Sequence, residues 1–259
     1  SVQFVTAGTS NVSFGLYKPQ EYCQNVPDLV TPCYTNGPLS DSAVSTSTAL
    51  RQFPYTAGDR YGSDQPASTS IASAGQVGAV YGVAVARNTG SVFVSAFMKR
   101  YAAFGPGGTG AIYRSLPYSS TAAATLFLDI NALMGANAAG VDPHPSTWLT
   151  SSNDALSYDT VGKISLGDLE INEAEDTLYT VNLASRELLM MRVGAPQVAP
   201  TSVVAQGALP GPGQMGHFPI PAPCSNALVD ARPFALGVNN GLVYVGGVCT
   251  GESAQIANS

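Results

Sequence analysis

The chain has 259 residues, of which 45% are hydrophobic and only 11% are charged, against roughly 25% charged residues in an average soluble protein. A net charge of −6 gives an acidic surface that repels phosphate backbones, so we expect no binding to nucleic acid. No apolar run approaches the length of about 18 residues that a membrane span needs, so we expect no membrane insertion. The 27 glycines and 18 prolines, together with enough apolar residues for a core, are typical of an extracellular β-protein with turn-rich connections.

The cysteines favour an oxidising compartment. The simplest pairing is local, Cys23 with Cys33 and Cys224 with Cys249, although other pairings stay open and a zinc site built from all four thiolates is an alternative. Each local bridge would stabilise the fold by roughly 3 kcal/mol. Residues 1–15 have neither the basic start nor the apolar block of a signal peptide, so we expect a secreted or cell-surface protein whose signal peptide has been removed.

Within the first part of the chain, residues 1–75, only residues 1–18 alternate between apolar and polar. This alternation predicts a strand, a turn and a second strand. Residues 19–75 are rich in Pro, Ser, Thr and Asp, and we expect a long loop region held by the bridge between Cys23 and Cys33. We assign 1–75 to the same domain as the remainder, in which 76–259 form the repeated β-structure.

Three segments share one pattern of a short strand, a tight turn and a returning strand. They cover 81–85 with 92–94, 167–171 with 178–181, and 233–236 with 242–245. In each, two apolar residues precede an aromatic residue that we expect on the same side of the hairpin, as Val83 and Val85 with Phe93. The equivalent positions are Leu169, Ile171 and Tyr179, and Phe234, Leu236 and Tyr244. Three hairpins in one register indicate a repeat.

Further strands are predicted between these hairpins, at 111–113, 124–128, 188–193 and 203–204, with a helical turn at 130–133. A hairpin with one or two outer strands, repeated along the chain, is typical of a β-propeller blade. The spacing between hairpins is longer than one blade needs, so we expect an all-β, partial or insertion-rich β-propeller. A β-sandwich is the alternative fold.

One acidic cluster is the main candidate for metal binding. Asp168, Glu170, Glu173, Glu175 and Asp176 surround the turn of the second hairpin, and hard oxygen ligands on a turn suit calcium. We therefore take Asp168, Glu170 and Asp176 as candidate calcium ligands. The alternative is an ordinary solvated hairpin turn, because the spacing is not that of an EF-hand.

Other chemistry-bearing residues favour ordinary loops. His144 and His217 lie in proline-rich segments without metal-ligand spacing, although with a carboxylate such as Asp129 they could serve a metal or acid–base chemistry. The glycine-rich stretch 104–110 lacks the Gly-Lys-Ser/Thr ending of a phosphate-binding loop, and no G-x-S-x-G nucleophile elbow occurs. We assign no catalytic and no cofactor-binding residue.

Five stretches of the chain, 94–113, 142–145, 161–169, 178–183 and 230–236, together carry a resemblance to a known family. In these stretches the chain resembles the N-terminal, propeller-like region of large bacterial surface proteins that carry SdrD B-like (Cna-B type) repeats. The resemblance implies a secreted or surface-displayed region without catalysis, although the repeats and the surface anchor of those proteins are missing here.

The function we expect is therefore a structural, adhesive or extracellular-assembly role, with other extracellular or surface proteins, or further copies of the chain, as partners. Two alternatives stay open. A calcium-dependent propeller hydrolase or lactonase would need acidic residues at the starts of the inner strands, where only Asp168 is clearly placed. A carbohydrate-binding propeller would need only exposed tyrosines and polar loops.

Overall fold

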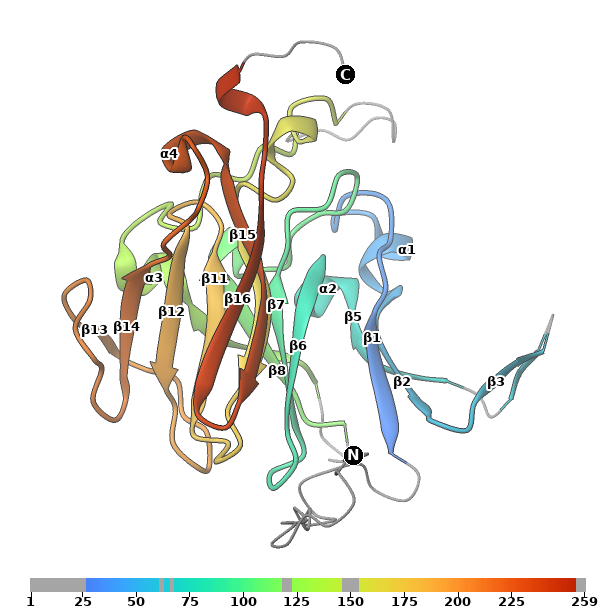
Figure 1. The fold of residues 1–259 in the computed structure, drawn as a ribbon. Coiled ribbons are helices and arrows are strands. Elements are labelled where there is room, and N and C mark those ends of the chain that lie inside the picture. The colour runs from blue at the N-terminus through green and yellow to red at the C-terminus, as the bar shows by residue number, and fades with distance from the viewer. Residues whose placement is uncertain (1–26, 61–62, 66–67, 118–122, 146–153, 255–259) are drawn as a thin grey trace, which may run out of the picture.

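A computed structural model describes residues 27–60, 63–65, 68–117, 123–145 and 154–254. The described residues are mostly β-strand and form several antiparallel sheets, none of which closes on itself, with only short helices between them (Figure 1). The expected all-β class is therefore confirmed. The strand pair predicted at 1–18 lies outside the described residues.

The first sheet occupies a region in which the sequence predicted a loop. It has the order β1-β2-β5 and is accompanied by a small β3-β4 hairpin and two one-turn helices. The bounds are β1 Asp28–Pro32, α1 Ser42–Ser45, β2 Thr48–Pro54, β3 Gly58–Arg60, β4 Ser63–Gln65, β5 Thr69–Ser73 and α2 Ala74–Val77. The loop prediction for 19–75 is wrong over these strands, because β2 and β5 each bury only two adjacent residues, Ala49 with Leu50 and Ile71 with Ala72, and so give no apolar alternation.

The second and third sheets carry two of the predicted hairpins. The second has the order β6-β7-β8-β9, and the third the order β10-β11-β12-β14-β13, in which only the β13–β14 pair is parallel. Their bounds are β6 Val80–Ala86, β7 Ser91–Ala96, η2 Gly108–Gly110, β8 Ala111–Ser115, β9 Thr125–Asp129, α3 Ile130–Met134, η3 Tyr158–Thr160, β10 Leu166–Ile171, β11 Thr177–Asn182, β12 Glu187–Arg192, β13 Ser202–Val203 and β14 Gln214–Pro219. In the second sheet the hairpin has the outer strands that the sequence predicted, whereas the third sheet also contains β14, which pairs with β12 and was not predicted.

The third predicted hairpin forms a two-stranded sheet near the end of the described chain. It consists of β15 Ala231–Asn239 and β16 Leu242–Cys249, preceded by α4 Ala227–Asp230 and followed by η4 Glu252–Ala254. The turn residues Asn240 and Gly241 have φ angles of 51° and 72°, which is the type I′ conformation that suits a two-residue hairpin turn.

The expected side of the aromatic residue is wrong in all three hairpins. Phe93 pairs with Ala84, Tyr179 with Glu170, and Tyr244 with Gly237, so each aromatic residue lies opposite a position that the prediction placed on the other face. The length of each turn decides this parity, and a shift of one residue moves every side chain to the opposite face. The hairpins themselves are where the sequence predicted them.

Successive sheets pack face to face with a core cluster between each pair. One cluster joins the first sheet to the second, another the second to the third, and a smaller one the third sheet to the β15–β16 hairpin. Two glycines allow the first strands of neighbouring sheets to approach closely. A Cβ on Gly82 would lie 2.4 Å from the backbone nitrogen of Leu169, and one on Gly167 would lie 2.7 Å from the carbonyl oxygen of Phe234. Strand β10 therefore lies between β6 and β15.

The glycine-rich stretch 104–110 is a packing loop. The amide of Gly107 donates to the hydroxyl of Tyr113 at 3.0 Å, and a Cβ on Gly105 would collide with the backbone of Val77 at 2.5 Å. Burial raises the pKa of Tyr113 to about 12, although the bond from Gly107 opposes the shift. Gly105 therefore allows close contact between this loop and the backbone of Val77.

Candidate functional site: the β15–β16 hairpin and its pocket

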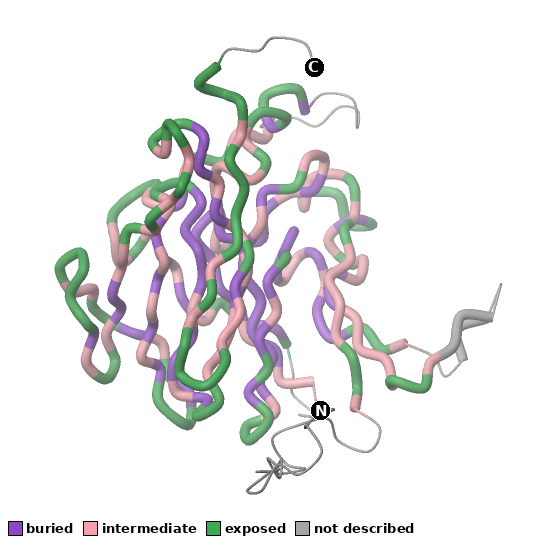
Figure 2. Tube along the Cα trace, viewed as in Figure 1, coloured by how far each residue is buried: buried purple, intermediate pink, exposed green. Residues whose placement is uncertain are grey.

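The β15–β16 hairpin buries one face and exposes the other. Phe234, Leu236, Val243 and Val245 belong to the apolar cluster shared with the third sheet. On the opposite face, large apolar side chains of β16 are open to solvent, with exposed fractions of 58% for Leu242, 55% for Tyr244 and 66% for Val248. The strand labelled β16 in Figure 1 is accordingly exposed along much of its length in Figure 2.

β16 is also an edge strand. It pairs with β15 along its whole length, from Leu242 opposite Asn239 to Cys249 opposite Ala231, and no described strand pairs with its other side. In an antiparallel hairpin with a two-residue turn, the pair next to the turn is hydrogen-bonded and the pairs then alternate. The backbone groups of Val243 and Val245 therefore point away from β15, toward the open edge.

The far end of the hairpin is tied down by a disulfide between Cys224 and Cys249. The sulfur atoms are 2.00 Å apart and the Cα atoms 5.5 Å apart, which is ordinary disulfide geometry. The bridge fixes the proline-rich segment after β14 to the last residue of β16. For the other expected pair, Cys23 lies outside the described residues, so the bridge to Cys33 stays a prediction.

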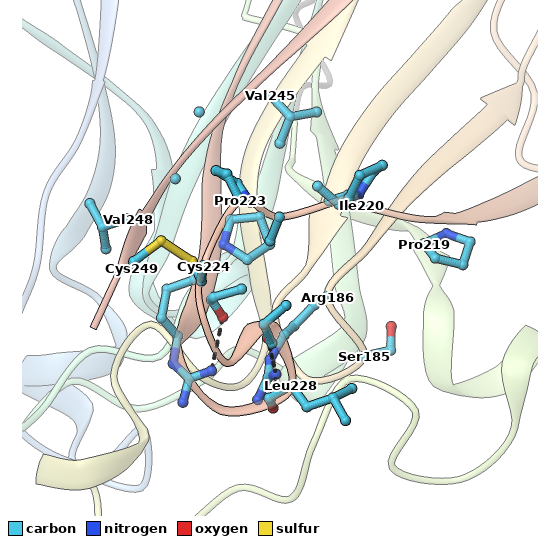
Figure 3. Close-up of a pocket in the computed structure, with 18 of the residues that line it drawn as sticks. Ser185, Arg186, Pro219, Ile220, Pro223, Cys224, Leu228, Val245, Val248 and Cys249 are labelled. Atoms are coloured by element: carbon cyan, nitrogen blue, oxygen red, sulfur yellow. Dashed lines mark hydrogen bonds between the residues drawn. A yellow bond between two sulfur atoms is a disulfide. The ribbon is translucent and has the colours of Figure 1, made fainter. Parts of the chain in front are cut away.

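A pocket of about 540 Å³ lies beside this disulfide (Figure 3). Its walls are the turn between β11 and β12, the segment from Pro219 to Cys224, helix α4, and the ends of β15 and β16. Most of the lining is apolar, and the largest such side chains are those of Pro219, Ile220, Pro223, Leu228, Val245 and Val248. A volume of this size is typical of pockets that hold small organic molecules.

Two arginines line the pocket, and none of the lining residues that the structure describes is acidic. Arg186 has a positive φ of 58° and donates through Nη1 to the carbonyl oxygens of Ala227 and Leu228. Burial lowers the pKa of Arg186, and the nearby charge of Arg232 lowers it further, whereas Glu252 opposes the shift.

The side chain of Arg232 is only 14% exposed. Its Nη2 donates to Glu252 at 2.7 Å and its Nη1 to the carbonyl oxygen of Ala231 at 3.0 Å. The buried Nε has no hydrogen-bond partner among the described residues. Neither arginine stands out in the sequence, because they are 46 positions apart and only the packing of the third sheet against the hairpin brings them together.

The acidic cluster proposed as a calcium site mainly connects neighbouring sheets. Glu175, with a side chain only 4% exposed, accepts from the amides of Arg87 and Asn88 in the β6–β7 turn, both at 2.9 Å. On the other side, Glu173 accepts from the amide of Asn240 at 2.6 Å, and Asp168 accepts from the amide of Leu236 at 3.2 Å. These carboxylates therefore hold the neighbouring hairpins against the third sheet.

The three candidate calcium ligands are not gathered into one site. Asp176 binds within its own turn, accepting from Asn172 at 2.8 Å and Thr177 at 2.7 Å, and these bonds lower its pKa. Burial, and then the charge of Asp168, raises the pKa of Glu170 to about 7. Within the described ranges, no group of three His, Cys, Asp or Glu residues is placed to hold a metal ion.

The two histidines lie in separate places with different carboxylates. His144 contacts Asp142 at 2.7 Å and, at 3.6 Å, Asp154, whereas His217 contacts Glu187 at 3.0 Å. Asp129, the third group considered with them, caps helix α3 by accepting from the amide of Asn131 at 2.9 Å. The structure does not bring these groups together.

Comparison with known proteins gives one group of relatives. The chain is similar to Colossin-D of Dictyostelium discoideum. The two are 34% identical over 241 residues, which is 92% of this chain and 24% of that protein. Colossin-C and Colossin-B of the same organism are 27% and 25% identical over 98% of the chain, which covers 24% and 6% of their lengths. The chain thus spans about a quarter or less of these relatives. No family model matches, and no solved structure matches.

The resemblance to bacterial surface proteins with SdrD B-like repeats is therefore wrong. The stretches that carried it are largely the strands and turns of the hairpins, such as β7 to β8 and β10 to β11. Alternating apolar residues and glycine turns recur in any hairpin-rich sequence, so they do not separate one such family from another. In the part of the chain that the structure describes, no helix is long and apolar enough to cross a membrane.

Proposed function

We propose that the chain acts outside the cell as a non-catalytic assembly module, and that the open edge of β16 joins it to a second copy. The observation that carries this proposal is an eight-residue edge strand with three exposed large apolar side chains. An extracellular location is supported by the disulfide between Cys224 and Cys249, since such bridges persist mainly in oxidising compartments.

The proposed architecture is an open β-propeller in which each sheet is one blade. Support comes from the order of the sheets along the chain and from the adjacent first strands β6, β10 and β15. The hairpin of β15 and β16 then corresponds to the first two strands of a blade whose outer strands are not among the described residues. An incomplete blade explains why the edge of β16 is apolar and open, because the strand that would pair with it is missing from the described residues.

The strand β16 lacks charged residues and prolines, two of the devices that normally prevent strand addition, although its partner β15 has a register shift between Pro233 and Ala235. Natural edge strands carry charges, prolines or bulges that discourage pairing with another chain. The sequence of β16, LVYVGGVC, contains no charged residue and no proline. An antiparallel pairing of β16 with β16 of another copy is self-complementary around a two-fold axis, and no like charges on the two strands would oppose it.

The test is sedimentation velocity over a wide range of protein concentrations. We expect the wild-type chain to form a dimer as concentration rises, and the variants Tyr244→Lys and Val245→Pro to remain monomeric. Lysine places a charge on the exposed face, and proline removes a backbone donor that points to the open edge and not to β15. A matched control is Leu209→Lys, at a leucine that is 79% exposed in the loop between β13 and β14.

The control should dimerise as the wild type does. A wild-type chain that stays monomeric at all concentrations would contradict the proposal that a second copy pairs with the edge of β16. Equal dimerisation of wild type and both β16 variants would place the contact elsewhere on the molecule.

A further inference from the structure

The pocket beside the disulfide has a chemical character that self-association does not explain. Its walls are mostly apolar, yet Arg186 and Arg232 both line it, and no acidic side chain does so among the described residues. The chain has only 11 lysines and arginines in all, and its net charge is −6. Arg232 is paired with Glu252, whereas Arg186 donates only to backbone carbonyl oxygens, so the pocket of this acidic protein holds a cation that has no carboxylate partner among the described residues.

Both arginines retain unused donors. Arg186 engages only Nη1, so its Nε and Nη2 make no hydrogen bond within the described part of the chain. The Nε of Arg232 is buried and also has no partner there. A buried donor without an acceptor costs about 1–3 kcal/mol, and more where the group is charged. An acceptor that enters the pocket would recover this cost.

We propose that this pocket binds an organic carboxylate with an apolar body. The carboxylate is the group that matches the planar, forked donors of arginine, and it offers two oxygens that can accept from both guanidinium groups. The apolar body lies against the wall made by Ile220, Pro223, Val245 and Val248, whose labelled side chains surround the pocket in Figure 3. A ligand with ten or so carbon atoms is well within the range that pockets of this volume hold.

Isothermal titration with decanoate tests the proposal, with decanol and acetate as the matched probes. Decanol keeps the apolar chain without the charge, and acetate keeps the charge without the chain. We expect decanoate to bind at least tenfold more tightly than decanol, and acetate to give no measurable binding. Equal affinities for decanoate and decanol would show that the pocket binds the apolar chain and not the carboxylate, which would contradict the proposal. No binding of decanoate would overturn the site.

A pair of variants at one position separates a specific site from nonspecific binding. Leu228 lines the rim of the pocket and is 86% exposed, so a polar residue there leaves the core intact. We expect Leu228→Glu to weaken decanoate binding about tenfold, because it adds a negative charge close to the carboxylate, and Leu228→Gln to bind as tightly as Leu228→Ala. Equal affinities of the Glu and Gln variants would contradict the placement of the carboxylate.

The titration is repeated on Tyr244→Lys, in which the proposed dimer does not form. Tyr244 does not line the pocket, so decanoate should bind this variant as it binds the wild type. If the wild type dimerises but does not bind decanoate, the pocket proposal alone is overturned. If the wild type binds decanoate but does not dimerise, the dimer proposal alone is overturned. Loss of decanoate binding in the Tyr244 variant only would show that the ligand needs the dimer and would contradict the site as described.

Discussion

The second sheet and the β15–β16 hairpin begin with the same motif and differ in what lies beside it. In the second sheet, β8 and β9 pair outside the hairpin, and all six residues of β7 are buried, among them Phe93. In the last hairpin no described strand covers β16, and Tyr244, the aromatic residue at the matching position, is 55% exposed. One sequence pattern can thus give a core strand or an open edge, depending on the next strand.

The largest expected effect is on stability. Phe93→Ala should lower the free energy of unfolding by about 3–5 kcal/mol, because it leaves a cavity in a fully buried site. Tyr244→Ala should change it by less than about 0.5 kcal/mol in the monomer, because the side chain is mostly solvated. Urea unfolding at a dilute protein concentration measures both. Similar losses in the two variants would mean that β16 is covered in solution even at that concentration.

A smaller effect is expected from the carboxylates that connect the sheets. Glu175→Gln should cost about 1–3 kcal/mol, because the buried carboxylate accepts from two backbone amides of the neighbouring turn. Glu173→Gln should cost much less, because the bond from Asn240 is exposed. Thermal or urea unfolding of the two variants gives the comparison. If Glu173→Gln were the more damaging, the last hairpin would be held more tightly than its exposure indicates.

The smallest expected effect is a dependence of stability on pH. Glu170 has a pKa raised to about 7 from its usual value of 4.5, so the folded state holds this proton more tightly than the unfolded state does. Stability from this group is therefore present below pH 4.5 and is lost as the pH rises toward and through 7. Unfolding free energies measured across this window should fall, and Glu170→Gln should flatten the fall. An unchanged slope in the variant would assign the effect to other groups.

His144 extends the same trend to higher pH. Burial opposes its protonation, but the hydrogen bond to Asp142 and the charges of Asp142 and Asp154 outweigh burial and raise its pKa above 6.5. A raised pKa for a histidine gives stability that is fully present below 6.5 and is lost as the pH rises through the folded-state pKa. The Glu170→Gln variant should still lose stability as the pH rises through the pKa of His144.

The sequence predicted what repeats locally. The three hairpins, the strands at 111–113, 124–128 and 188–193, and the helical turn at 130–133 all follow from residue alternation and turn residues, which act over a few positions. The first sheet was missed because its strands lie among polar and proline residues and become strands through pairing with one another.

The candidate sites depended on contacts that no spacing reveals. The acidic residues of the second hairpin were conspicuous in the sequence, but their bonds go to backbone amides of the turn after β6 and of β15 and its turn, so their role is visible only once the sheets are packed. The pocket was invisible for the same reason, since Arg186 and Arg232 belong to different sheets.

Hydrogen exchange of the β16 backbone tests the account most directly. The amides of Val243 and Val245 point to the open edge, so they should exchange quickly in dilute protein and become protected as concentration rises, while those of Leu242 and Tyr244, which pair with β15, stay protected throughout. Fast exchange of the two valine amides at every concentration, in a sample that sedimentation shows to be dimeric, would contradict the claim that β16 is where copies of the chain meet.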